Sequence, residues 1–89
     1  MTITVDHLWT RLAAHEGDVF RQIRGGEFTY ALADGSILPD RTDWAIPRKH
    51  MEEALTLVPL QSTVPIQHLY GPSYIYAVLM DERIRLQDW

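Results

Sequence analysis

The sequence contains no cysteine, and this absence removes several classes of protein at once. Disulfide scaffolds, thiolate zinc sites and cysteine nucleophiles all need that residue. An excess of positive charge is missing too, because eight Lys and Arg against twelve Asp and Glu give a net charge of −4, and neither half of the chain is basic. The composition therefore disfavours non-specific nucleic-acid binding through a broad cationic face.

Long apolar runs are also lacking. The longest, residues 74–80, is far shorter than a membrane span, and the opening MTITVDHLW has neither the basic nor the apolar region of a signal peptide. We therefore expect a cytoplasmic protein without membrane contact. A length of 89 residues is typical of one domain, so we expect residues 1–89 to form a single small globular domain.

The first apolar residues follow the period of an α-helix. They recur at i, i+3, i+4, i+7 and i+8, at Val5, Leu8, Trp9, Leu12 and Ala13. Thr4 suits the N-cap of this helix, and Gly17 suits its C-terminal stop. The spacing predicts an amphipathic helix that begins near residue 5.

Residues 19–38 have the pattern of a small antiparallel meander. A β-branched and aromatic run at 19–23 is followed by the turn-forming Arg24-Gly25-Gly26-Glu27, and apolar residues then alternate at Phe28, Tyr30 and Leu32. Asp34-Gly35 is a strong two-residue hairpin signal, which predicts a returning strand at 36–38. Pro39 ends that strand, and residues 40–45 form a polar loop.

The second half predicts helices. Pro47 suits the first turn of a second helix that Pro59 stops, and residues 65–69 suit a short helical turn. A last helix runs from Pro72 to about residue 81, with a buried strand as the alternative because Tyr, Ile and Val favour strands. The tail, residues 84–89, is either a short edge strand or a loose end. The fold class is therefore α+β: an N-terminal helix, a small antiparallel β-hairpin or meander, then two or three helices.

Catalytic and metal-binding patterns are weak. His7 and His15 lie about 80° apart around a helix axis, and no histidine pair has the spacing of metal ligands. The serines lack a nucleophile elbow, and the carboxylates occupy caps, turns and polar runs. Gly25-Gly26, with Arg21 and Arg24 nearby, leads into a strand and so indicates a turn rather than a phosphate loop. We expect no metal, no cofactor and no enzymatic activity.

A first candidate site is a partner surface on the last helix. That helix is apolar nearly all round, which is typical of a helix buried on several sides or shared with a partner. Tyr and Met are favoured at protein interfaces. The residues of this candidate surface are Tyr70, Tyr74, Tyr76 and Met80.

A second candidate site is an anion or nucleic-acid patch at the expected start of the second helix. Unpaired N–H groups and the helix dipole attract anions there. Trp44, just before, can anchor the loop or offer a stacking face, while Asp40 and Asp43 can instead pair with the arginines. The residues of this patch are Arg41, Arg48, Lys49 and His50.

These features lead to two main hypotheses. The first is a small non-enzymatic interaction module that self-associates or binds another protein through the tyrosine-rich helix. The alternative is a nucleic-acid-binding or regulatory accessory domain that uses Arg41, Arg48 and Lys49. A small enzyme is a third class, which a closed cleft holding two convergent polar side chains would support.

Overall fold

A computed structural model describes residues 3–89 and begins with the expected helix, α1 (Val5–Ala14). The Thr4 hydroxyl accepts a hydrogen bond from the His7 backbone N–H at 3.2 Å, so the predicted N-cap is confirmed. Leu8 and Leu12 are fully buried on the inner face of the helix. The periodicity thus placed both the helix and the side that packs on the core.

Five short strands follow, and they form two antiparallel sheets. β1 (Phe20–Arg21) pairs with β2 (Glu27–Phe28), and β3 (Tyr30–Ala33) pairs with β4 (Ser36–Pro39). The predicted antiparallel strands are confirmed, but they are divided between two sheets at Thr29. The Thr29 N–H donates to the Asp40 carboxylate at 2.9 Å, which commits Thr29 to the β4 side.

The Asp34-Gly35 turn is confirmed. Both residues have positive φ, 52° and 74°, as a two-residue hairpin of this type requires. A strand that the sequence did not indicate, β5 (Ile46–Pro47), extends this sheet in the order β3-β4-β5, with Ile46 opposite Ile37. Residues 40–45 are therefore a loop between two paired strands.

Helix α2 (Arg48–Leu55) begins one residue later than predicted. Pro47 has an extended backbone with ψ at 151° and caps the helix rather than entering its first turn. A short 3₁₀ turn, η1 (Val64–Ile66), falls where residues 65–69 predict helical structure. Helix α3 (Pro72–Leu79) confirms the predicted last helix and excludes the strand alternative.

The prediction for the tail was wrong, because residues 82–85 form another helix, α4 (Glu82–Arg85). The Asp81 carboxylate accepts from the Arg83 backbone N–H at 2.9 Å and so caps this helix. The chain then returns to the core, where the Trp89 indole N–H donates to the Leu79 carbonyl at 2.7 Å.

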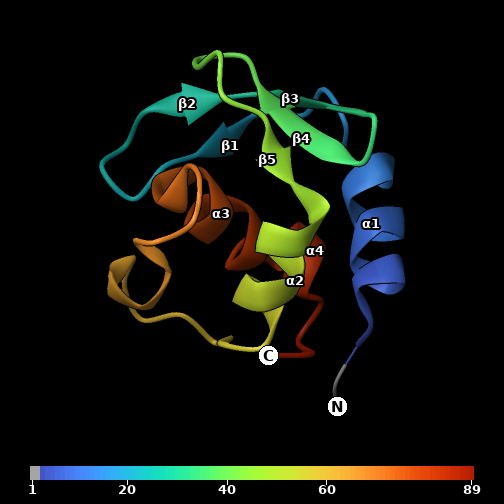
Figure 1. Cartoon of the computed structure of the whole chain (residues 1–89), viewed down its shortest axis with the longest axis vertical. Coiled ribbons are helices and arrows are strands. Elements are labelled where there is room, and N and C mark those ends of the chain that lie inside the picture. Colours follow the sequence, from blue (N-terminus) through green and yellow to red (C-terminus); the bar gives the residue numbers. More distant parts are fainter. Residues whose placement is uncertain (1–2) are drawn as a thin grey trace.

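The core lies between the strands and the helices. In Figure 1 the strands gather at one end of the molecule, and α1 stands on the side of α2 and α4 away from α3. Helix α1 packs against α2 and α4, and α3 packs against α2, α4 and β1.

Within residues 3–89 no helix has the length and apolar character needed to cross a membrane.

Candidate functional site: an exposed aromatic cluster

The tyrosine-rich helix is mainly part of the core. Ile75, Val78 and Leu79 of α3 are buried. Tyr74 is half-buried, and its ring meets the buried ring of Phe28 edge-on at a centroid distance of 4.9 Å. A helix that is apolar nearly all round is thus accounted for by neighbours within one chain.

Two other members of the predicted partner surface are also half-buried. Tyr76 packs against the core, and the Met80 sulfur accepts a hydrogen bond from the Leu60 backbone N–H at 3.3 Å. The structure therefore does not gather Tyr70, Tyr74, Tyr76 and Met80 into one exposed face. Only Tyr70, just before the helix, is strongly exposed.

Tyr70 belongs instead to a cluster with two residues from other elements. Its ring lies 5.7 Å from that of Trp44, centroid to centroid, and 4.6 Å from that of His50, both close to edge-on. Trp44 is 65% exposed and Tyr70 46% exposed. We call these three residues, Trp44, His50 and Tyr70, the aromatic cluster.

His50 fixes the position of Tyr70 through the backbone. The His50 imidazole Nδ1 accepts a hydrogen bond from the Tyr70 N–H at 3.0 Å. Because His50 lies in the first turn of α2, this bond attaches the loop before α3 to a rigid helix. The exposed tyrosine is therefore held in place.

Gly71 allows the two loops to approach each other. Its φ is +56°, and a Cβ built there would lie 3.1 Å from Cδ1 of Ile46, the buried β5 residue that follows the Trp44 loop. The Trp44 backbone N–H is in turn bonded to the Thr42 hydroxyl at 3.2 Å. The αL glycine and the pairing of β5 with β4 thus bring Trp44 and Tyr70 together.

The four residues of the predicted anion patch have different surroundings. Arg48 is paired with Asp6 of α1, and its guanidinium lies 5.6 Å from the centre of the Trp9 ring. Arg41 donates to the Glu27 carbonyl at 3.2 Å. His50 belongs to the aromatic cluster. The pairing partner of Arg48 is therefore on α1 rather than at Asp40 or Asp43.

Two opposite charges remain beside the aromatic cluster. Asp43 precedes Trp44, Lys49 precedes His50, and both side chains are exposed. Among the hydrogen bonds and ion pairs of residues 3–89, neither side chain has a partner. The exposed aromatic surface thus carries one acid and one base that are available to another molecule.

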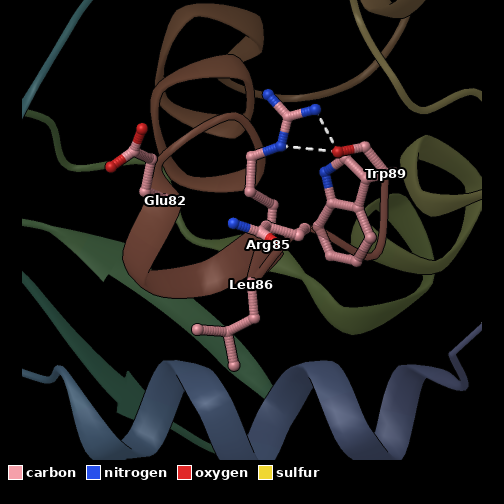
Figure 2. A pocket seen from close by; sticks show the side chains of 5 residues that line it. Glu82, Arg85, Leu86 and Trp89 are labelled. Atoms are coloured by element: carbon pink, nitrogen blue, oxygen red, sulfur yellow. Dashed lines mark hydrogen bonds between the residues drawn. The ribbon is translucent and has the colours of Figure 1, made fainter.

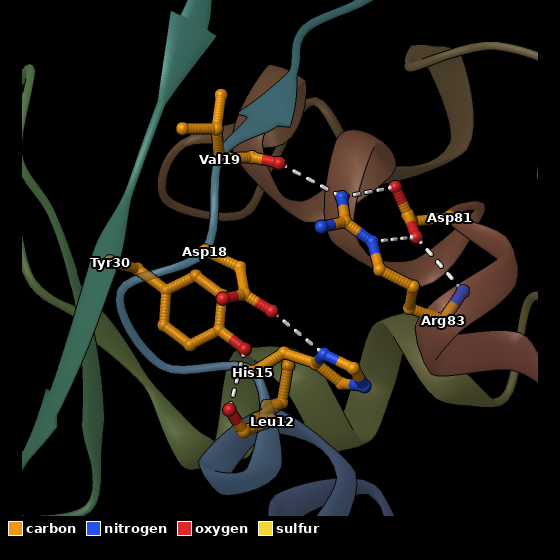
Figure 3. A network of polar contacts seen from close by, with 7 residues as sticks. All are labelled: Leu12, His15, Asp18, Val19, Tyr30, Asp81 and Arg83. Atoms are coloured by element: carbon orange, nitrogen blue, oxygen red, sulfur yellow. Dashed lines mark hydrogen bonds and ion pairs between the residues drawn. The ribbon is translucent and has the colours of Figure 1, made fainter.

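A second set of polar contacts surrounds the buried ring of Tyr30 (Figure 3). The Tyr30 hydroxyl donates to the Leu12 carbonyl at 2.6 Å, which joins β3 to the last turn of α1. Burial, with the nearby carboxylates of Asp18 and Glu16, raises the pKa of Tyr30 far above its ordinary value. Tyr30 is 2% exposed, so this hydroxyl is a structural group and not one that meets a ligand.

Arg83 completes the network. Its guanidinium donates to the Val19 carbonyl and to Asp81, each at 2.9 Å, and lies 4.0 Å from the centre of the Phe20 ring. Hydrogen bonding to Arg83 lowers the pKa of Asp81 despite partial burial, and the same bonding raises the pKa of Arg83. These contacts attach α4 to the chain before β1.

The surface has two larger hollows. One, about 620 Å³, lies at the C-terminal segment, where Arg85 donates to the Trp89 backbone oxygen at 2.6 Å (Figure 2). The other, about 530 Å³, lies between the β1–β2 turn, η1 and the start of α3. In the part of the chain that the structure describes, no three His, Cys, Asp or Glu side chains are grouped to hold a metal ion.

Comparisons of the chain with protein-family models, with curated proteins and with solved structures give no match. The fold and the contacts of the individual residues are therefore the basis for a functional assignment.

Proposed function

We propose that this protein is a non-catalytic interaction module and that it associates with a second copy of itself through the aromatic cluster. The observation that carries the proposal is the Trp44–Tyr70 pair, two large aromatic rings that contact each other and remain 65% and 46% exposed. Trp and Tyr are the residues most enriched at the energetic centres of protein interfaces. Leaving Trp44 in water forgoes the burial of a large apolar surface.

The charges beside the cluster favour a second copy as the partner. In a two-fold symmetric interface, each surface residue of one chain faces the matching patch of the other. Asp43 and Lys49 are exposed, carry opposite charges and adjoin Trp44 and His50 in sequence, which favours a patch that is complementary to itself. A standard interface covers about 800 Å² on each partner, a modest part of the 5282 Å² surface.

Nucleic acid fits this surface less well. The chain carries a net charge of −4, and two of the arginines near the cluster are engaged, Arg48 by Asp6 and Arg41 by the Glu27 carbonyl. Among the bases there, Lys49 is the one without a hydrogen-bond or ion-pair partner within residues 3–89. Affinity for a phosphate backbone grows with the number of cations that contact it, and one lysine supplies little.

The first test is the molecular mass in solution. Light scattering at micromolar concentration is expected to give twice the 10.3 kDa chain mass for the wild type. Trp44→Ser should weaken the dimer by at least about thirtyfold, the loss expected of an interface hot spot. The matched control is Leu38→Ser, which changes an exposed apolar residue on β4 outside the cluster and should leave the mass unchanged.

Charge reversal tests the symmetric arrangement. Lys49→Asp alone should weaken the dimer by placing like charges opposite each other, and Lys49→Asp combined with Asp43→Lys should restore it. A wild-type protein that stays monomeric at every concentration overturns the proposal. Binding of single-stranded DNA or RNA at low salt, lost in Trp44→Ser, would support the nucleic-acid alternative instead.

A further inference from the structure

The 530 Å³ groove is the second feature that the fold leaves open to a ligand, and it is separate from the aromatic cluster. Three segments far apart in the sequence form it: the β1–β2 turn, η1 with the residues after it, and the start of α3. In Figure 1 the β1–β2 turn and the first turn of α3 lie side by side. The lining residues are Gln22, Ile23, Arg24, Thr63, Gln67, Pro72 and Ser73.

The groove lining is positively charged, although the chain as a whole has a net negative charge. Twelve of the 89 residues are acidic, yet no carboxylate lines the groove, and its single charged residue is Arg24. The nearest acid in sequence, Glu27, is paired with Arg21 at 3.3 Å. The groove is therefore a locally positive site on an acidic protein.

Arg24 is set apart from every other arginine. The chain has seven arginines, and six of them donate a hydrogen bond to an oxygen of the protein within residues 3–89. Those six are Arg11, Arg21, Arg41, Arg48, Arg83 and Arg85. Arg24 alone has no such bond, so its five N–H donors face solvent at the edge of the groove.

Other residues of the groove offer further donors. The Gln22 amide donates to the Ser73 hydroxyl at 2.9 Å, which leaves the hydroxyl proton of Ser73 available to a ligand. Gly26 makes room for this amide, because a Cβ there would lie 2.8 Å from Oε1 of Gln22. Thr63 and Gln67 add side-chain donors that have no partner among the described residues.

We propose that this groove binds the carboxylate of a small acyl amino acid or of a peptide C-terminus, with Arg24 as its charge partner. A planar guanidinium matches a carboxylate through two parallel hydrogen bonds. One arginine balances the single charge of a carboxylate, whereas a phosphate monoester carries about −1.5 to −2. Ile23 and Pro72 supply apolar surface for the body of the ligand, and the volume exceeds what a lone inorganic ion fills.

The test is a titration of ¹⁵N-labelled protein followed by amide chemical shifts. N-acetyl-leucine is expected to move the signals of Ile23, Arg24 and Ser73, and its methyl ester, which lacks the charge, is expected to leave them in place. Arg24→Gln should weaken binding about tenfold or more, as loss of a charge-assisted bidentate contact does. Lys49→Gln is the matched control, since it also removes one positive charge that has no partner within residues 3–89 but lies outside the groove.

Two further arms make the outcome unambiguous. A short peptide ending in leucine, with its carboxyl free or amidated, separates the sources: tighter binding of the free peptide than of N-acetyl-leucine assigns a peptide C-terminus. Equal shifts with acid and ester, unchanged binding by Arg24→Gln, or binding of inorganic phosphate alone would each overturn the assignment. Repeating the titration with Trp44→Ser keeps the result independent of self-association.

Discussion

At the scale of single residues, a few polar side chains join separate elements by donating to backbone carbonyls. The clearest is the Tyr30 hydroxyl, which donates to the Leu12 carbonyl at 2.6 Å inside the core. Its ring also lies 5.4 Å from that of Phe20. Tyr30 thus contributes both apolar packing and one directional bond between α1 and β3.

Tyr30→Phe removes that bond and keeps the ring. We expect the free energy of unfolding to fall by about 1 kcal/mol, the usual net value of one buried hydrogen bond. Urea denaturation followed by far-ultraviolet circular dichroism measures the change. The control is Tyr76→Phe, whose hydroxyl makes no hydrogen bond within residues 3–89 and whose loss should change stability little.

The difference in unfolding free energy between the wild type and Tyr30→Phe should also depend on pH. Burial raises the pKa of Tyr30 in the folded protein, while in the unfolded chain it has the ordinary value near 10. The stabilising contribution of Tyr30 is therefore complete below pH ~10 and is lost as the pH rises above it, because only the unfolded state then ionises. The difference in stability between wild type and Tyr30→Phe should narrow above pH ~10, and a difference that widens there would contradict this account.

At the scale of elements, local signals were sufficient where one segment determined its own structure. Neighbouring residues in the sequence determine three such features: the N-cap and period of α1, the Asp34-Gly35 turn, and the Gly71-Pro72 start of α3. Strand β5 was missed because it is two residues long and exists only through its pairing with Ile37 of β4. Pairing with β4 depends on the tertiary structure, so the local sequence around β5 does not predict the strand.

The tail helix α4 was missed for a different reason. The sequence predicts that the preceding helix runs to about residue 81, whereas Asp81 is the N-cap of α4 and Glu82 lies in its first turn. Both interpretations use the same acidic residues, and the choice between them depends on Trp89 and Arg83 reaching back to the core. A helix of four residues is stable only through such tertiary contacts.

The sequence singled out each residue of the aromatic cluster but did not predict that the three residues lie together. Tyr70 was assigned to the partner surface on the last helix, whereas His50 and the nearby Trp44 were assigned to the anion patch. Their meeting depends on Gly71 adopting φ +56° against Ile46. Likewise, Arg24 has no hydrogen-bond partner within residues 3–89 because of where the carboxylates lie in the fold, and the sequence alone does not show those positions.

Gly71→Ala tests whether the close approach of Gly71 to Ile46 brings the residues of the aromatic cluster together. The new Cβ would meet Ile46 at 3.1 Å and force a positive φ on an L-residue, so we expect a destabilisation of about 2 kcal/mol. Gly17→Ala is the matched control: its φ is +88°, but a Cβ there meets nothing within 4 Å. It should cost about 1 kcal/mol, from backbone strain alone.

The fluorescence environment of Trp44 should change in Gly71→Ala and not in Gly17→Ala, because only the first substitution disturbs the contact between the two loops. Thermal and urea unfolding supply the stability comparison. Equal losses of stability in the two variants would show that position 71 requires glycine only for its positive φ. Gly71 would then not be what positions the aromatic cluster.

At the scale of the whole molecule, residues 3–89 carry two separate candidate sites on one small α+β fold. The aromatic cluster lies on the loops before β5 and α3, with Asp43 and Lys49 beside it. The groove with Arg24 lies between the β1–β2 turn and α3. Because different residues form them, the proposed self-association and the proposed carboxylate binding should be separable, and a variant that loses one should retain the other.

The most direct test of the central claim locates the interface itself. An isotope-filtered nuclear Overhauser experiment on a one-to-one mixture of labelled and unlabelled protein reports only contacts between chains. The account predicts intermolecular contacts from the Trp44 indole to Tyr70 and to Lys49 of the second copy. Intermolecular contacts located elsewhere, for example at Leu86 or Val19, with none at Trp44, would contradict it.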